Sequence, residues 1–174
     1  MERVPLLGAD AQLDAAGRAA RDQIVASRGA VLRPFAVLLH QPALARRVGE
    51  LGAELRFAGD LRDDQRELVI LATARAHRCA FEWVSHHDLA LAAGVRPGAI
   101  AALEADAGDE TFTDDEMPLV AFARALVRSS AVDDATFARA RALLGTSGVV
   151  ELAALVGYYS MLAHVLNSCA PGAD

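Results

Sequence analysis

Apolar side chains recur every three to four residues along most of the chain, and no segment shows the apolar and polar alternation of a strand. Glycine and proline separate the helical segments from one another. The pattern therefore predicts an all-α fold in which a long, mostly apolar helix comes last. The predicted helices cover the ranges 10–28, 33–39, 42–57, 64–75, 79–93, 97–104, 113–129, 133–145 and 147–167.

Capping residues mark several of the predicted helix ends. Gly94 follows the segment 79–93 and has the residue type that most often ends a helix. Thr113 and Glu116 have the spacing of a capping box, which predicts a helix with Thr113 as its N-cap that runs to about Ser129. Asp133 is an N-cap for the next helix, which is expected to end near Gly145.

The segments 64–75 and 79–93 are expected to form an antiparallel helical hairpin, with a tight turn near His77. Glu67 lies ten residues before His77, and His86 lies nine residues after it. At a rise of about 1.5 Å per residue, both side chains lie roughly 14 Å from the turn. The spacing therefore predicts that Glu67 and His86 face each other.

Four residues of this hairpin can carry chemistry: Glu67, Cys79, Glu82 and His86. The last three share one helix face, because their spacing places them within about 60° of arc. Structural interpretations stay open beside this one. Glu67 and His86 could form a buried salt bridge that only holds the hairpin, Cys79 could be a small buried side chain, and Glu82 could be a solvated surface residue.

Size and charge exclude several classes of protein. A chain of 174 residues fits one domain that spans its whole length. No apolar run reaches the roughly 20 residues of a membrane span, and residues 1–10 lack the apolar core of a secretory signal, so we expect a cytoplasmic protein without a membrane partner. A net charge of −6 without any lysine disfavours nucleic acid as a partner.

The apolar content and the cysteines add two expectations. Apolar residues make up 53% of the chain, which favours a homo-oligomer that hides part of this surface. Cys79 and Cys169 are too few for a disulfide framework in a chain of this length, and a reducing compartment keeps both as thiols.

The stretch 66–94 resembles the two-helix signature of the carboxymuconolactone decarboxylase family, which includes the AhpD-like alkylhydroperoxidases. The similarity rests on Glu67, on the run Cys79-x-x-Glu82-Trp83-x-x-His86 and on Gly94-Val95. The segments 39–45 and 156–159 are similar to further family segments, so the resemblance covers roughly residues 30–168. It implies an AhpD-like helical fold, and it implies a homotrimer or homohexamer with pockets between subunits.

Glu82 departs from the AhpD-like pattern. In that branch the signature is Cys-x-x-Cys-x-x-x-His, preceded by a glutamate twelve residues before the first cysteine. Glu67, Cys79 and His86 fit this pattern, but Glu82 replaces the second cysteine. The resemblance assigns the attack on a hydroperoxide to that second thiol, and the first thiol then resolves it into a disulfide. Cys79 therefore lacks its near partner for thiol peroxidase chemistry.

Three functions stay open at this point. The favoured one is a cofactor-free lyase or acid–base enzyme that acts on a small carboxylated or cyclic metabolite. In this function His86 is the proton donor and Glu67 holds its other ring nitrogen. Glu82 is an alternative acid or base. The second is a hydroperoxide reductase that uses Cys79 with a pKa lowered at a helix N-terminus. The third is a helical oligomer that binds a ligand without catalysis.

Two further residues are candidate substrate contacts. The resemblance places the segment of His40 near the pocket, and Trp83 lies within the signature. A capping or core role for His40 and a core or interface role for Trp83 are the structural alternatives. No metal site is predicted, because Glu82 and His86 alone do not supply the three ligands that a metal needs.

Overall fold

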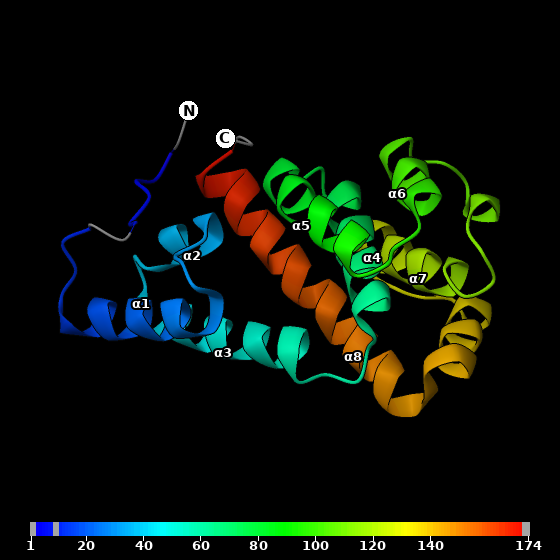
Figure 1. Ribbon diagram of the computed structural model, residues 1–174, viewed down its shortest axis with the longest axis horizontal. Coiled ribbons are helices and arrows are strands. Elements are labelled where there is room, and N and C mark those ends of the chain that lie inside the picture. The colour runs from blue at the N-terminus through cyan, green and yellow to red at the C-terminus, as the bar shows by residue number, and fades with distance from the viewer. Residues whose placement is uncertain (1–2, 9–10, 172–174) are drawn as a thin grey trace. The chain divides into compact units, whose positions relative to one another are not determined.

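The computed structural model describes residues 3–8 and 11–171, and within these ranges every regular element is a helix (Figure 1). This confirms the all-α prediction. The described residues fall into two compact units. The first contains the residues up to Ala58 together with those from His164 on, and the second is Gly59–Ala163. The single domain predicted for the whole chain stays a prediction.

The first unit contains the helices α1 (Ala15–Arg28), α2 (Arg33–Leu38) and α3 (Pro42–Phe57), and α3 packs against the other two. The bounds of α3 are those predicted. The start predicted for α1 was wrong, because Asp14 caps this helix by accepting a hydrogen bond of 2.7 Å from the backbone N–H of Gly17. The predicted start at residue 10 itself lies outside the described residues.

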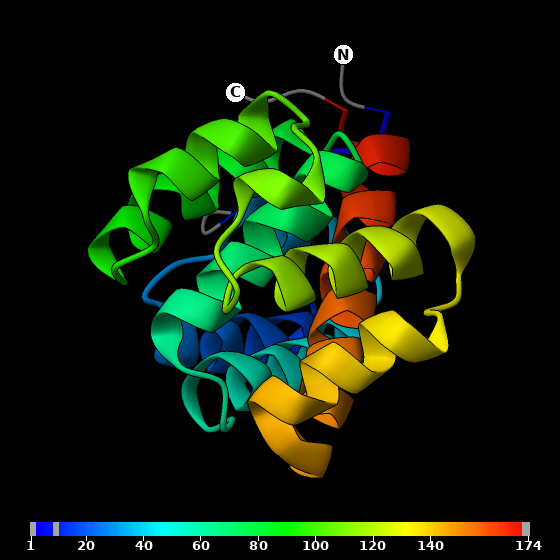
Figure 2. The same ribbon diagram turned by 90° about the vertical axis from the view of Figure 1, so that its right-hand side faces the viewer.

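The second unit is built around α4 (Asp63–Ala76), which contacts α5 (Ala80–Ala92), α6 (Pro97–Glu104) and α7 (Met117–Ser129) (Figure 2). Helix α4 buries side chains on all its faces, since four consecutive positions are apolar and inaccessible to water: Leu68, Val69, Ile70 and Leu71. A helix with this pattern is stable only when other elements cover it. Polar side chains on α4 are therefore brought into the interior of this unit.

The turn between α4 and α5 lies where the sequence predicts it. Arg78 adopts a left-handed conformation with a φ of 52°, and its N–H donates to the carbonyl of Arg75. The N–H of Cys79 donates to the carbonyl of Ala74 at 2.9 Å. These bonds end α4 and make Cys79 the N-cap of α5, so α5 starts one residue later than predicted.

Helix α7 starts later than predicted, and this is a correction. The capping box of Thr113 and Glu116 forms, with hydrogen bonds of 3.0 and 3.3 Å. The residues that follow make only a turn, and α7 begins at Met117 with a proline in its first turn. The 3₁₀ helix η1 (Asp109–Thr111) precedes it in the chain.

The last helix, α8 (Asp134–Cys169), contains the break predicted near Gly145, which has a φ of 72° and a ψ of −176°. Asp133 caps the helix by accepting hydrogen bonds from the backbone N–H groups of Ala135 and Thr136. Among the described residues, α8 is the helix whose length and composition would allow it to cross a membrane. Half of its most apolar window is buried in the fold, as in a core helix, so this is weak evidence for a membrane span.

Gly145→Ala is expected to lower the free energy of unfolding by about 1–3 kcal/mol, because only glycine adopts this combination of φ and ψ without strain. No atom lies within 4 Å of the position of an added Cβ, so backbone strain is the only cost. Urea unfolding measures the change. Gly157→Ala is the matched control, since Gly157 has equal space around it in a regular part of α8 and its replacement should be neutral or stabilising.

Candidate active site

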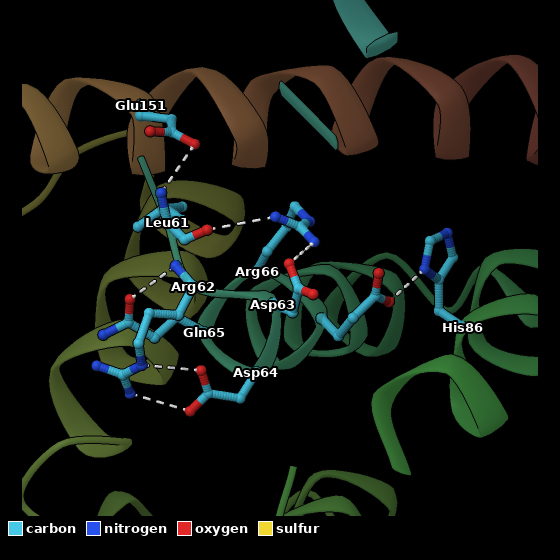
Figure 3. Close-up of polar contacts among 9 residues, drawn as sticks. Leu61, Arg62, Asp63, Asp64, Gln65, Arg66, His86 and Glu151 are labelled. Carbon is cyan, nitrogen blue, oxygen red and sulfur yellow. Dashed lines mark hydrogen bonds and ion pairs between the residues drawn. The ribbon is translucent and has the colours of Figure 1, made fainter. Parts of the chain in front are cut away.

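Glu67 on α4 and His86 on α5 form a buried hydrogen bond, which confirms that they face each other as predicted (Figure 3). The distance between Oε2 of Glu67 and Nδ1 of His86 is 2.6 Å, and each side chain is only 6% exposed. A carboxylate can only accept, so Nδ1 of the imidazole carries the proton of this bond. The other ring nitrogen, Nε2, is left to interact elsewhere.

Glu82 lies on the other side of the imidazole. Its Oε2 is 3.6 Å from Nε2 of His86, and its side chain is 4% exposed. The interpretation of Glu82 as a solvated surface residue was therefore wrong, because α5 turns this position toward α4. His86 thus lies between two buried carboxyl groups. At 3.6 Å, Nε2 of His86 and Oε2 of Glu82 are within ion-pair distance but too far apart for a hydrogen bond.

Tyr159 packs against the imidazole. Its ring meets that of His86 edge to face, with the centroids 5.2 Å apart and the planes at 88°. Tyr158 meets Tyr159 in a similar way at 5.3 Å. These contacts restrict the plane of the imidazole and so help to aim both ring nitrogens at their carboxyl partners. The sequence did not assign Tyr159 to the site, because an aromatic residue on an apolar helix is usually a core residue.

Cys79 is buried, with 2% of its surface exposed. Burial raises the pKa of its thiol above the ordinary value, and the negative charge of Glu82 raises it further. The backbone N–H groups of Glu82 and Phe81 act in the opposite direction but do not outweigh burial. The peroxidase hypothesis depends on a Cys79 pKa that is lowered by the helix N-terminus, and this prediction is therefore wrong. Cys79 is a thiol near neutral pH rather than a thiolate.

A surface pocket of about 260 Å³ opens at the N-terminus of α5. Its walls combine apolar groups with two arginines and one carboxylate, and its lining residues are Ala74, Arg75, Arg78, Cys79, Ala80, Trp83, Val84 and Glu104. Glu67, Glu82 and His86 are absent from this described lining. Cys79 is therefore the residue of the predicted quartet that faces the pocket, with Glu82 and His86 following it along α5.

The remaining predicted residues have different surroundings. Trp83 is half-buried and lines the pocket, and a substrate contact by this residue stays a prediction. His40 belongs to the first unit, where it is exposed and its Nε2 donates to the carbonyl of Pro5 at 2.8 Å. A substrate contact by His40 stays a prediction. In the part of the chain that the structure describes, no three His, Cys, Asp or Glu residues are placed to hold a metal ion.

Glu82→Gln is expected to lower the pKa of Cys79, because it removes a negative charge that disfavours the thiolate. The rate of alkylation by iodoacetamide, measured against pH, should then rise at a lower pH than in the parent protein. A Cys169→Ser background leaves one thiol to follow. Asp88→Asn removes an exposed charge from the same helix and should leave the profile unchanged, whereas equal profiles for the parent and Glu82→Gln would refute the electrostatic effect.

The fold and the site define an all-helical protein whose central hairpin holds an imidazole between two carboxyl groups. The family model of the carboxymuconolactone decarboxylase family matches residues 42–125, which contain the whole hairpin. This match agrees with the family resemblance that the residues of the hairpin predicted. No curated protein sequence matches the chain.

Solved structures of AhpD-like proteins share the fold. An uncharacterised peroxidase-related protein from Silicibacter sp. TM1040 is 15% identical with a TM-score of 0.77, over 99% of this chain and 92% of its own. An uncharacterised peroxidase-related protein from Ralstonia eutropha JMP134, described as an alkylhydroperoxidase AhpD core, is 21% identical with a TM-score of 0.76, over 98% of this chain and 92% of its own. The debrominase Bmp8, a cysteine-to-alanine variant in complex with 2,3,4-tribromopyrrole, is 15% identical with a TM-score of 0.76, over 100% and 94%. These similarities confirm the AhpD-like fold.

Proposed function

We propose that the protein is a cofactor-free acid–base enzyme, in the manner of a lyase, that acts on a small carboxylated or cyclic metabolite. The observation that carries this proposal is the imidazole of His86 between the buried carboxyl groups of Glu67 and Glu82. A structural salt bridge needs only one carboxylate. The second carboxyl group gives the imidazole a partner with which it can exchange a proton.

The order of groups along α5 supports a proton path to the pocket. Cys79 faces the pocket, Glu82 follows one turn later, and His86 follows one turn after that. Because its pKa is raised, Cys79 holds its proton near neutral pH and can act as the acid nearest the ligand. Glu82 and His86 can then return a proton to the thiol, and Glu67 holds the imidazole in place throughout.

Decarboxylation is a reaction that this path could serve. When the bond to the carboxylate carbon breaks, carbon dioxide leaves and the electron pair stays on the substrate as an enolate or dienolate. The substrate carbon that lost the carboxylate then takes one proton from the thiol of Cys79. Water replaces this proton through His86 and Glu82. The step is balanced without an oxidant or reductant, so the residues of the hairpin are sufficient for it.

Thiol-dependent reduction of a hydroperoxide is the second candidate. One observation favours it, since Cys79 faces the pocket, and the fold is shared with an alkylhydroperoxidase core. The thiolate would attack the peroxide oxygen, releasing an alcohol and leaving a sulfenic acid that two equivalents of an external thiol would reduce. The buried thiol and the neighbouring charge of Glu82 disfavour the thiolate that this reaction needs.

Two assays of the pure protein separate these candidates. Carboxymuconolactone-type acids are followed by carbon dioxide release, and an organic hydroperoxide with a thiol reductant is followed by peroxide loss. The proposal expects release of carbon dioxide and little peroxide loss. Peroxide loss that depends on Cys79, without reaction of any acid, would overturn the proposal in favour of the reductase. Inertness toward both classes would support a ligand-binding protein instead.

A further inference from the structure

The pocket beside Cys79 is lined by a cation that pairs with none of the described residues. Arg78 lines the pocket, and its side chain makes no hydrogen bond or ion pair with any residue that the structure describes. Arg75 also lines the pocket, but its guanidinium donates to the carbonyls of Leu103 at 3.3 Å and Glu104 at 2.7 Å. The donors of Arg75 are thus used by the backbone that forms the pocket wall, whereas those of Arg78 are available to a ligand.

The backbone holds Arg78 at the pocket. This residue has a left-handed φ of 52°, which is uncommon for a residue other than glycine, asparagine or aspartate. Hydrogen bonds of the turn on both sides, from the N–H groups of Arg78 and Cys79, keep this conformation. The position of the Cα of Arg78 relative to Cys79 is therefore constrained, although its exposed side chain can still adjust to a ligand.

The same pocket also has an apolar and aromatic wall. Trp83 offers an indole surface, and Ala74, Ala80 and Val84 add apolar contacts. A guanidinium binds a carboxylate through two parallel hydrogen bonds, and an indole packs against a flat or unsaturated ring. A pocket of about 260 Å³ lies just below the range of about 300–1,000 Å³ for drug-sized ligands, so it suits a smaller molecule. Its size and lining therefore fit a small ring that bears a carboxylate.

We infer that Arg78 anchors the carboxylate of the ligand, so that the pocket selects a small unsaturated carboxylic acid over its neutral analogue. This inference rests on the proposed function and names the residue that decides specificity for the same site. With the carboxylate on Arg78 and the ring against Trp83, the ligand is placed beside the thiol of Cys79. Arg78 positions the ligand and takes no part in proton transfer.

Tryptophan fluorescence tests the inference directly, because Trp83 is the one tryptophan of the sequence and lines the pocket. The protein is titrated with cyclopentenecarboxylate and, separately, with the uncharged cyclopentenecarboxamide. The acid should bind about tenfold more tightly than the amide, as expected when a charge-assisted pair is made. Equal affinities, or no response to the acid, would overturn the inference without any variant being needed.

Variants assign the preference to Arg78. Arg78→Gln should remove the tenfold preference for the acid, and Arg78→Lys should keep part of it because the charge remains. Arg141→Gln is the matched control, since Arg141 is an exposed arginine of α8 outside the pocket and its loss changes the net charge equally. An equal loss of acid binding in both glutamine variants would show a general charge effect and contradict the assignment.

The binding test can fail independently of the proposed function. His86→Gln should bind the acid as wild type does, because His86 does not line the pocket among the described residues. If the acid binds through Arg78 and no acid is ever turned over, the proposed function fails and the pocket assignment stands. If acids are turned over equally well by Arg78→Gln with an unchanged KM, the pocket assignment fails and the proposed function stands.

Discussion

His86→Gln is expected to lower kcat on a carboxylated substrate by about a hundred- to ten-thousand-fold, the range that general acid–base groups contribute. Glutamine can still donate a hydrogen bond to Glu67, so the hairpin should keep its structure, but it cannot take up and release a proton. KM should change little, since His86 does not line the pocket as described. Steady-state kinetics measures both constants.

His87→Gln is the matched control for this variant. His87 is the next residue of α5, it is partly exposed, and its Nδ1 bonds to the neighbouring Asp88 at 2.9 Å. Its replacement changes the same chemical group outside the buried cluster and should leave kcat unchanged. A kcat for His86→Gln within a factor of two or so of the His87→Gln value would remove His86 from the proton path.

Glu67→Ala is expected to lower the free energy of unfolding by about 2–4 kcal/mol. It leaves the buried N–H of His86 without its acceptor and opens a small cavity between α4 and α5. Glu67→Gln should cost less, because the amide oxygen can still accept the hydrogen bond from Nδ1. Guanidinium unfolding followed by circular dichroism measures both variants.

Glu54→Ala is the surface control for the stability measurement. Glu54 is an exposed helical glutamate on α3, and its replacement should change the free energy of unfolding by no more than about 0.5 kcal/mol. If Glu67→Ala were as mild as Glu54→Ala, the hydrogen bond between Glu67 and His86 would not be a strong support of the hairpin. The stabilising role of the hydrogen bond between Glu67 and His86 would then be contradicted.

Sequence patterns predicted the parts of the fold that local chemistry determines. Pro42 marks the start of α3, and Gly145 marks the break in α8, because these residue types restrict or free the backbone at their own positions. The facing of Glu67 and His86 also followed from spacing, since two helices joined by a short turn leave little freedom of register.

Other parts depended on tertiary packing and were not predictable in the same way. The thiol of Cys79 has the position of a helix N-cap, yet burial outweighs the effect of that position on its pKa. Tyr159 comes from α8, more than seventy residues after His86, so no local pattern connects the two rings. Arg78 reaches a pocket whose walls come from three separate helices and the turn, and only the folded chain shows that pocket.

Glu82 is both the residue that departs from the AhpD-like Cys-x-x-Cys pattern and a residue that affects the chemistry of the site. The resemblance predicts that it takes the position of the second cysteine of the AhpD-like pattern, and the structure places its carboxyl group near the imidazole of His86. The same carboxylate raises the pKa of Cys79. With glutamate in place of that cysteine, the site lacks the thiol to which the resemblance assigns the attack on a hydroperoxide, the remaining thiolate is disfavoured, and His86 gains a second carboxyl partner. All three effects point away from peroxide reduction and toward proton transfer.

The most direct test of this account is hydroperoxide turnover by wild type, Glu82→Cys and Cys79→Ser in the presence of a thiol reductant. Glu82→Cys restores two thiols one helical turn apart and removes the charge that disfavours the thiolate. The account predicts that wild type consumes little hydroperoxide and that Glu82→Cys consumes it at least tenfold faster. Rapid consumption by wild type that is lost in Cys79→Ser would contradict it.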